Sequence, residues 1–215
     1  MTAPATSEKT LRRDAQRNRD SILVAARALL ARDGVDASVE EITREAGVGM
    51  GTLYRHFPTK ADLVDAVLED AFAEIVQAAE DALAEEDAWS ALTGFFEHAL
   101  ELHAENRGLK DALAATEQGR ARGEAMRTRM RPVLAQMVAR AQEQGALRLD
   151  FDPKDVPLVF WTASRVIEVT EDVAPGFWRR YVGLLFDGFR VGAATPLPRP
   201  PLTGPQLGRI AGSRS

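Results

Sequence analysis

The chain is most informative at first through what it lacks. It contains no cysteine, which excludes disulfides and thiolate zinc sites. No run approaches the roughly 20 apolar residues that cross a bilayer, and residues 1–20 have no apolar core of a secretory signal. These absences predict a globular protein of the cytoplasm with no membrane partner.

Signals of catalysis are also scarce. The three histidines are His56, His98 and His103. His98 and His103 are five residues apart, so on one helix they point in different directions and cannot share a metal. No GxSxG, HExxH or glycine-rich phosphate loop is present. We therefore expect no catalytic residue, no metal and no cofactor.

Charge is distributed unevenly. The net charge is −5, yet residues 1–60 carry 10 Lys and Arg against 8 Asp and Glu. The segment 9–19 is sharply basic, with five cations against Asp14 alone: Lys9, Arg12, Arg13, Arg17 and Arg19. A basic end on an acidic body favours contact of that end with a polyanion, the alternative being a solvated helix face.

Helical periodicity and punctuation dominate the first part of the chain. Helices are expected at 14–32, from Ser38 to Ala46, at 49–55 and at 60–83. Gly34 and Gly47 end the first two, Ser38 with Glu41 reads as a capping box, and Thr59 can cap the last. Two short helices around Gly47 predict a helix-turn-helix within a three-helix unit.

The rest of the chain also predicts helices, so the expected fold class is all-α. We expect them at 87–105, 107–118, 120–144, 153–172 and 175–193. Asp152 and Pro153 suit a helix start, but Pro157 leaves 156 as an alternative start. The proline-rich segment 195–215 is predicted to be extended or disordered.

The stretch "GVGMGTLYRHFPTKADLV", residues 47–64, resembles the DNA-binding domain of TetR-family transcriptional regulators, through Thr52-Leu53-Tyr54-x-His56-Phe57-x-x-Lys60. The resemblance implies a flexible basic arm at 1–13, a helix-turn-helix domain at 14–64, a ligand-binding and dimerisation domain at 65–194, and a tail at 195–215. It also implies a homodimer, a double-stranded DNA operator and a small-molecule effector.

The resemblance further implies roles in DNA binding. Ser38 and Thr43 would approach the backbone or groove edge, and the start of the second motif helix would face the bases. Tyr54, His56 and Lys60 would contact phosphates, although His56 also suits a helix-end cap. Arg55 is equally well explained as a solvated charge, and Met50 stands where family members often carry a polar residue. The full set of expected contacts is Arg17, Ser38, Thr43, Gly49, Met50, Gly51, Thr52, Tyr54, Arg55, His56 and Lys60.

Apolar residues of the second part allow two interpretations. One is a ligand pocket with an adaptable methionine lining, and the other is an ordinary core. The candidate pocket residues are Trp89, Phe96, Leu100, Leu113, Glu117, Met126, Met130 and Met137.

The last predicted helix carries a stripe that suits a dimer interface. Together with the preceding helix it could pair with its symmetry mate in a four-helix bundle, or it could pack against its own domain. The candidate interface residues are Trp161, Trp178, Tyr181, Val182, Leu185, Phe186 and Phe189.

Three functions remain open from the sequence. The first is a repressor released from a pseudo-palindromic operator by a small ligand. The second is a DNA-binding regulator without a small ligand, either an activator or controlled by a partner protein. The third is a helical binding protein or enzyme that has no DNA function, which the basic segment and the helix-turn-helix disfavour.

Overall fold

The computed structural model describes residues 5–106, 117–193 and 195–212. Within these ranges the chain is helical and forms no strand, only an isolated antiparallel bridge between Leu147 and Arg190. The all-α prediction is therefore confirmed. The predicted helix at 107–118 and the pocket candidate Leu113 fall largely outside the described residues. The chain divides into two compact units, Met1–Ala71 with Asn106–Gly119 and Phe72–Glu105 with Arg120–Ser215.

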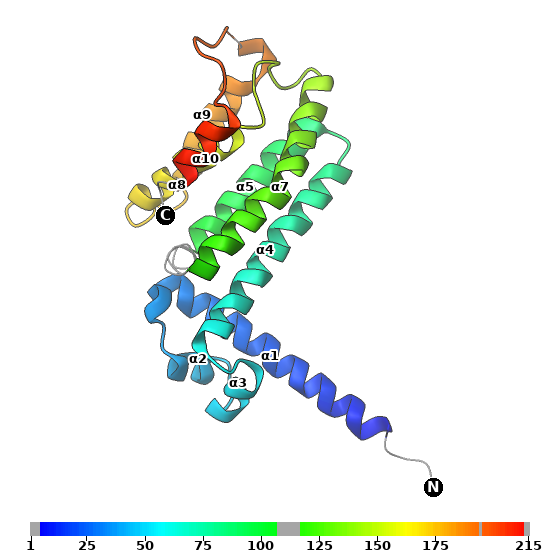
Figure 1. Cartoon of the computed structure of the whole chain (residues 1–215), viewed down its shortest axis with the longest axis vertical. Helices are drawn as coiled ribbons and strands as arrows, with labels where there is room; N and C mark the ends of the chain where they lie inside the picture. The colour runs from blue at the N-terminus through cyan, green and yellow to red at the C-terminus, as the bar shows by residue number, and fades with distance from the viewer. Residues whose placement is uncertain (1–4, 107–116, 194, 213–215) are drawn as a thin grey trace. The chain divides into compact units, whose positions relative to one another are not determined.

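The first unit is built from α1 (Ala5–Asp33), the short helix η1 (Gly34–Asp36), α2 (Val39–Glu45), α3 (Met50–His56) and the beginning of α4 (Lys60–Ala84). Figure 1 shows these elements in blue and cyan. Apolar side chains from each of the four α-helices meet in one core, whose fully buried members include Ile22, Leu30, Ile42, Leu53 and Leu63. Burial of these side chains is the main force that fixes two helices of only seven residues.

Helix α1 begins at Ala5, so residues 5–13 of the segment predicted as a flexible arm are helical. The prediction overlooked that neither glycine nor proline interrupts the sequence between Ala5 and Asp33. Side chains one turn apart support the exposed part of the helix. Gln16 donates to Asp20 Oδ1 at 2.7 Å, and Arg17 pairs with Asp14.

The turn between α2 and α3 follows the predicted helix-turn-helix. Gly47 has a φ of 67°, in the left-handed region that favours glycine, and Val48 N donates to Thr43 O at 3.0 Å. Gly49 is extended and forms the N-cap of α3, where Thr52 N donates to Gly49 O at 2.9 Å. The reversal of the chain therefore depends on Gly47, while Leu53 anchors α3 in the core.

The second unit contains the rest of α4 and the helices α5 (Ala88–Glu105), α7 (Glu117–Glu143), α8 (Val156–Thr170), α9 (Trp178–Phe189) and α10 (Gly204–Gly212), with the short helix η2 (Val191–Ala193) after α9. The first three residues of α7 group with the first unit. A second apolar core joins α4, α5, α7, α8 and α9 and includes Leu100, Met137, Leu147, Ile167 and Trp178.

Side chains at the C-terminal end of α7 hold the loop between α4 and α5. Arg140 donates to Leu83 O at 2.7 Å and to Glu85 O at 2.5 Å, at the end of α4. Gln144 donates to Glu86 O and accepts from Ala88 N, both at 2.9 Å. These bonds satisfy carbonyl groups that the end of α4 leaves without helical partners.

Arg148 connects the loop after α7 to the segment that follows α9. Its buried guanidinium donates to both carboxylate oxygens of Asp150, at 2.5 and 2.9 Å, to Gly188 O at 3.3 Å, and to Thr195 O. The hydrogen bonds from Arg148, together with its positive charge, lower the pKa of Asp150 to about 2.

One predicted helix start had been left open between two positions, and another needs correction. Helix α8 begins at Val156, the alternative start, with Asp155 as N-cap and Pro157 in its first turn. Helix α9 begins at Trp178, after Gly176 with a φ of 75°, and not at 175.

The proline-rich tail, predicted to be extended or disordered, contains α10. Thr203 starts this helix: its hydroxyl accepts from Gln206 N at 3.4 Å, while Gln206 Oε1 accepts from Thr203 N at 2.9 Å. Pro205 lies in the first turn, where a proline is tolerated. The reciprocal cap at Thr203 therefore stabilises a helix in a tail whose proline content had predicted none.

Candidate nucleic-acid interface

Helix α3 divides its side chains between the core and the surface. Leu53 and Phe57 are buried, as predicted. Tyr54 is 45% exposed although it is a large aromatic residue, and Arg55 beside it is exposed as well. The half-buried Thr52 accepts a hydrogen bond from Arg55 Nη2 at 3.3 Å. The exposed tyrosine and arginine, with the half-buried threonine in the same turn, can donate to or accept from a polar partner outside the protein.

Gly49 and Gly51 are exposed, and a Cβ atom at either position would meet open space. Neither has a positive φ, so the fold itself does not require glycine at these positions. A glycine within a helix costs about 0.5–1 kcal/mol relative to alanine. This cost applies to Gly51 alone, because Gly49 is the N-cap of α3, where glycine is well tolerated. Gly51 is explained if another molecule must approach this backbone closely.

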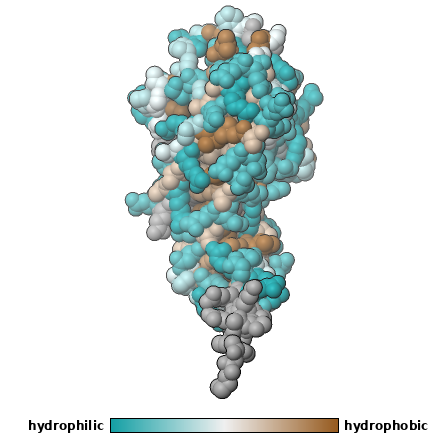
Figure 2. Space-filling model, turned by 90° about the vertical axis from the view of Figure 1, so that its right-hand side faces the viewer, coloured by the Kyte–Doolittle hydropathy of each residue, from teal (hydrophilic) through white to brown (hydrophobic). Residues whose placement is uncertain are grey.

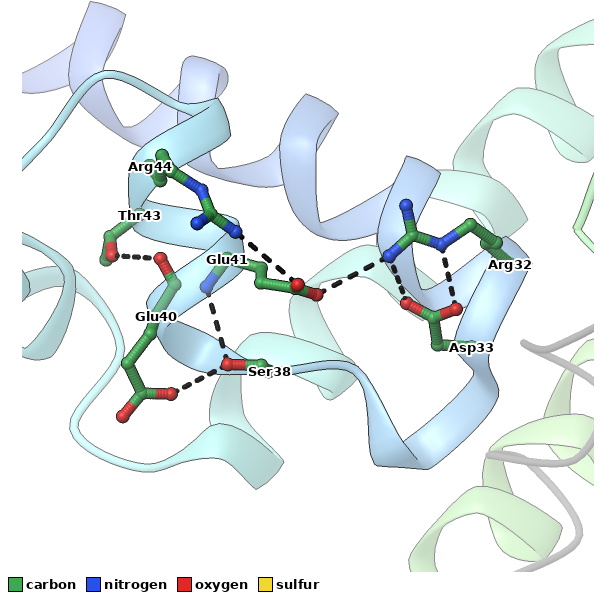
Figure 3. Close-up of polar contacts among 7 residues, drawn as sticks. All are labelled: Arg32, Asp33, Ser38, Glu40, Glu41, Thr43 and Arg44. Carbon is green, nitrogen blue, oxygen red and sulfur yellow. Dashed lines mark hydrogen bonds and ion pairs between the residues drawn. The ribbon is translucent and has the colours of Figure 1, made fainter.

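Ser38 caps α2 as predicted, with its hydroxyl accepting from Glu41 N at 3.4 Å (Figure 3). The rest of the predicted capping box differs, because the Ser38 hydroxyl donates to Glu40 Oε2 at 2.8 Å. The Glu41 carboxylate instead lies between two arginines, at 3.4 Å from Arg32 and 3.4 Å from Arg44. The two carboxylates of this turn therefore have different partners, a serine hydroxyl for Glu40 and two arginines for Glu41.

Thr43, expected at the groove edge, is buried. Its hydroxyl donates to Glu40 O at 2.9 Å and lies 3.6 Å from Met50 Sδ (Figure 3 shows the first contact). The position was misjudged because a short helix turns the side chain back along its own backbone, as threonine hydroxyls commonly do. Thr43 therefore lies buried against Met50, and its contact with DNA stays a prediction.

The first turn of α4 presents Lys60. Thr59 starts this helix with a reciprocal cap, in which Asp62 N donates to the Thr59 hydroxyl at 3.1 Å and Thr59 N donates to Asp62 Oδ2 at 2.9 Å. The pKa of Glu40 is lowered by the hydrogen bond from Ser38, then by a bond to its own backbone and by the positive charge of Lys60. Lys60 of α4 therefore lies near the first turn of α2.

Sequence reasoning missed Arg44, which lies in the last turn of α2 with its side chain 75% exposed. A basic residue just before the motif turn was the available signal. Arg17 is exposed on α1, and Arg19 of the same helix stacks on Phe57 at 5.6 Å from the ring centre. His56 is half-buried and packs beside Phe57 at 6.3 Å between ring centres. These residues add positive charge and aromatic surface to the α2–α3 region.

The residues expected to line a ligand pocket belong mainly to the second core. Phe96, Leu100, Met130 and Met137 are buried there. The half-buried Trp89 is covered by Arg190, whose guanidinium lies 4.3 Å from the ring centre. Met126 packs against the same core, and Glu117 is exposed. Burial of these four residues agrees with an ordinary core, and the pocket interpretation stays a prediction.

A cavity of about 230 Å³ occurs elsewhere in the second unit. Its lining comes from the ends of α5 and α8 and the start of α9: Glu101, Ala104, Glu105, Glu171, Trp178 and Arg179. Arg179 already pairs with Glu101 and stacks on Trp178, with its guanidinium 4.5 Å from the ring centre. The guanidinium of Arg179 therefore already neutralises the charge of Glu101.

The dimer-interface candidates also separate into two groups. Trp178, Val182 and Phe186 are buried in their own core, which corrects their assignment to a subunit contact. The half-buried Tyr181, Leu185 and Phe189 pack against this core, and Trp161 is half-buried as well. The apolar residues that α8, α9 and their connection expose are others, namely Val169, Val173, Phe177 and Leu184.

No described helix is both long and apolar enough to cross a membrane. Histidine, aspartate and glutamate side chains in the described ranges form no group of three that could hold a metal ion.

Comparison with known proteins gives two matches to family models. Residues 22–67 match the model described as bacterial regulatory proteins, tetR family, and residues 87–191 match a transcriptional regulator SbtR-like C-terminal domain. A curated HTH-type transcriptional regulator of Staphylococcus aureus (strain USA300) is 45% identical over 60 residues, which are 27% of this chain. The chain spans 32% of the length of that relative.

Solved structures match over a larger part of the chain. A TetR transcription regulatory protein from Mycobacterium vanbaalenii is 34% identical with a TM-score of 0.67, covering 84% of this chain and 99% of its own. A TetR transcriptional regulator from Streptomyces coelicolor is 30% identical with a TM-score of 0.65, covering 80% of this chain and 98% of its own. With the exposed face of α3 and the helix-turn-helix geometry, these matches show that the chain belongs to the TetR family of DNA-binding transcriptional regulators.

Proposed function

We propose that this regulator is a repressor that binds a pseudo-palindromic operator as a homodimer and leaves it when a small molecule binds. The observation that carries the proposal is the surface of α3, where two glycines that the fold does not need stand beside exposed Tyr54 and Arg55. A helix that fits the major groove needs small residues where its backbone meets the DNA.

The proposed DNA contacts fall into two groups. Met50 and Thr52, with the backbone at Gly49 and Gly51, would meet base edges, and Met50 suits the methyl group of thymine. Ser38, Tyr54, His56 and Lys60 would bind phosphates, with Arg17, Arg44 and Arg55 adding positive charge nearby. Exposure supports Tyr54, Arg55, Arg17 and Arg44 in these roles.

The proposed dimer uses the apolar surface that α8 and α9 leave exposed. Leu184 is 62% exposed and Val169 57% exposed, although both are aliphatic. Figure 2 shows the side of the second unit that is turned away from α8 and α9, and this side is mostly hydrophilic with separate hydrophobic areas. Pairing of helices around a two-fold axis would cover such residues and place two reading helices about 34–36 Å apart, the spacing of successive major grooves.

Release by a ligand requires that the ligand bind the DNA-incompetent state more tightly. Helix α4 contributes to both units as one continuous helix, which makes it the natural element to carry such a signal. A regulator without a small ligand is the second candidate. It is favoured by the burial of Phe96, Leu100, Met130 and Met137, the residues expected to line the pocket.

Fluorescence anisotropy with labelled duplexes from the DNA upstream of the protein's own gene tests the proposal. We expect one duplex to bind far more tightly than a scrambled duplex of the same length, with two protomers per duplex. Equal affinity for all duplexes would reject operator recognition. One protomer per duplex at saturation would reject the dimer while leaving DNA binding intact.

A further inference from the structure

The hydroxyl of Ser38 is already engaged in the DNA-free protein. It donates to Glu40 Oε2 at 2.8 Å while accepting from Glu41 N at 3.4 Å (Figure 3). A hydroxyl has a single proton, so it cannot donate to Glu40 and to a phosphate at the same time. The proposed phosphate contact of Ser38 therefore requires that the Glu40 carboxylate move.

The charge of a second proposed phosphate ligand acts on the same carboxylate. The positive charge of Lys60, from the first turn of α4, is among the charges that act on Glu40. Carboxylate and phosphodiester oxygens are both anionic acceptors and suit the same donors. Ser38 therefore donates to Glu40 the proton that it would donate to a DNA phosphate, and the positive charge of Lys60 acts on the carboxylate as it would act on the phosphate.

We propose that Glu40 is an intramolecular competitor of the DNA phosphate and so determines how strongly the protein binds DNA of any sequence. Its carboxylate takes the Ser38 hydroxyl and offsets the charge of Lys60 until a phosphate replaces it. The inference rests on the proposed function, because it requires that this surface of the first unit face DNA.

Exposure makes the exchange feasible. The Glu40 side chain is exposed on α2. The hydrogen bond from the Thr43 hydroxyl goes to the backbone carbonyl of Glu40 and does not involve its side chain. Rotation of the side chain therefore breaks the Ser38 contact without unfolding the turn. A carboxylate near a phosphate repels it, so Glu40 weakens binding to all sequences and lowers the salt concentration at which non-specific complexes dissociate.

The experiment compares Glu40→Gln with Glu45→Gln in the full chain. Both changes remove one negative charge from exposed positions of α2, but only Glu40 accepts from Ser38. Anisotropy with a mixed-sequence duplex, several helical turns long, is measured across a salt series, so no operator is needed. Circular dichroism melting confirms that each variant is folded.

We expect Glu40→Gln to bind about threefold more tightly than wild type, the effect of one exposed charge interaction. The plot of log affinity against log salt should steepen by up to about 0.9, the contribution of one phosphate contact. Glu45→Gln should change both quantities less. In a Ser38→Ala background, the gain from Glu40→Gln should shrink, because half of the shared contact has been removed.

Two results would overturn the inference alone. One is a Glu40→Gln protein that binds like Glu45→Gln, and the other is one that binds more weakly than wild type. Failure of wild type and both variants to bind any duplex at low salt would overturn the inference and the proposed function together.

Discussion

The two units of this chain use apolar residues differently, and this difference determines how clearly the sequence of each unit indicates its function. In the first unit a small core holds α3 so that the residues between its anchors are exposed, and those residues carry the family signature. In the second unit one apolar stripe on α9 is divided, with Trp178, Val182 and Phe186 buried and Leu184 exposed. In the first unit, exposed polar residues indicate the function. In the second unit, apolar residues that bind a partner must first be distinguished from apolar residues that pack in the core.

The largest expected effect tests this division within α9. Trp178 is 1% exposed and Leu184 is 62% exposed. Trp178→Ala should lower the free energy of unfolding by about 3–5 kcal/mol, because it leaves a cavity in the core. Leu184→Ala should change it by less than about 0.5 kcal/mol in a monomer. Urea unfolding at low protein concentration measures both, and equal losses would contradict the assignment of Trp178 to the core.

Leu184→Arg is the next test, aimed at the proposed dimer. The variant should remain helical by circular dichroism but sediment as a monomer, because a charge would be buried between subunits. Operator affinity should fall by roughly 100-fold, since two linked half-sites no longer bind together. Arg129→Glu, on the exposed surface of α7, is a control for a charge change in the same unit. A dimeric Leu184→Arg protein would exclude this face as the interface.

Lys60→Ala examines the first unit. Loss of one phosphate contact should weaken binding about three- to tenfold for all sequences and reduce the salt slope by about 0.9. Arg129→Ala removes the same charge from the second unit and should leave both unchanged. Anisotropy at several salt concentrations distinguishes the two, and an unaltered slope for Lys60→Ala would remove Lys60 from the interface.

Gly51→Ala separates stability from DNA binding at one position. Because an added Cβ meets open space, alanine should raise the free energy of unfolding by about 0.5–1 kcal/mol through its better helix propensity. The same methyl group should weaken operator binding by crowding the backbone against DNA. Thermal melting and anisotropy on the same sample check both signs. A stabilised variant with full affinity would show that α3 does not approach DNA at this residue.

The smallest effect concerns pH in the second unit. The pKa of Asp150 is lowered from 3.8 to about 2, chiefly by the hydrogen bonds from Arg148. A lowered pKa in the folded state contributes stability that is fully present above about pH 4 and is lost as the pH falls towards 2. Asp150→Asn should therefore flatten the acid side of a stability–pH curve. An identical curve for the variant would show that this pair contributes nothing measurable.

Several elements followed from the sequence because their signals are local. Gly47, Ser38 and Thr59 define the motif turn and two helix starts through contacts within a few residues, and each was predicted. The start of α1 at Ala5 and the helix α10 were missed, the first because basic charge was taken for flexibility and the second because proline content concealed a cap. The contact between Ser38 and Glu40 was missed as well, because the spacing of a capping box favoured Glu41 as the partner of Ser38.

The sequence by itself determined the fold class, the helix-turn-helix and the residues that α3 exposes, because helical periodicity and turn chemistry act over a few residues. Only the tertiary structure decided that Thr43 is buried, that Phe96 and Met137 fill a core, and that Leu184 is the exposed apolar residue of α9. The physical reason is that burial depends on which helices meet. An apolar stripe has the same spacing whether its partner is its own core, a ligand or a second subunit.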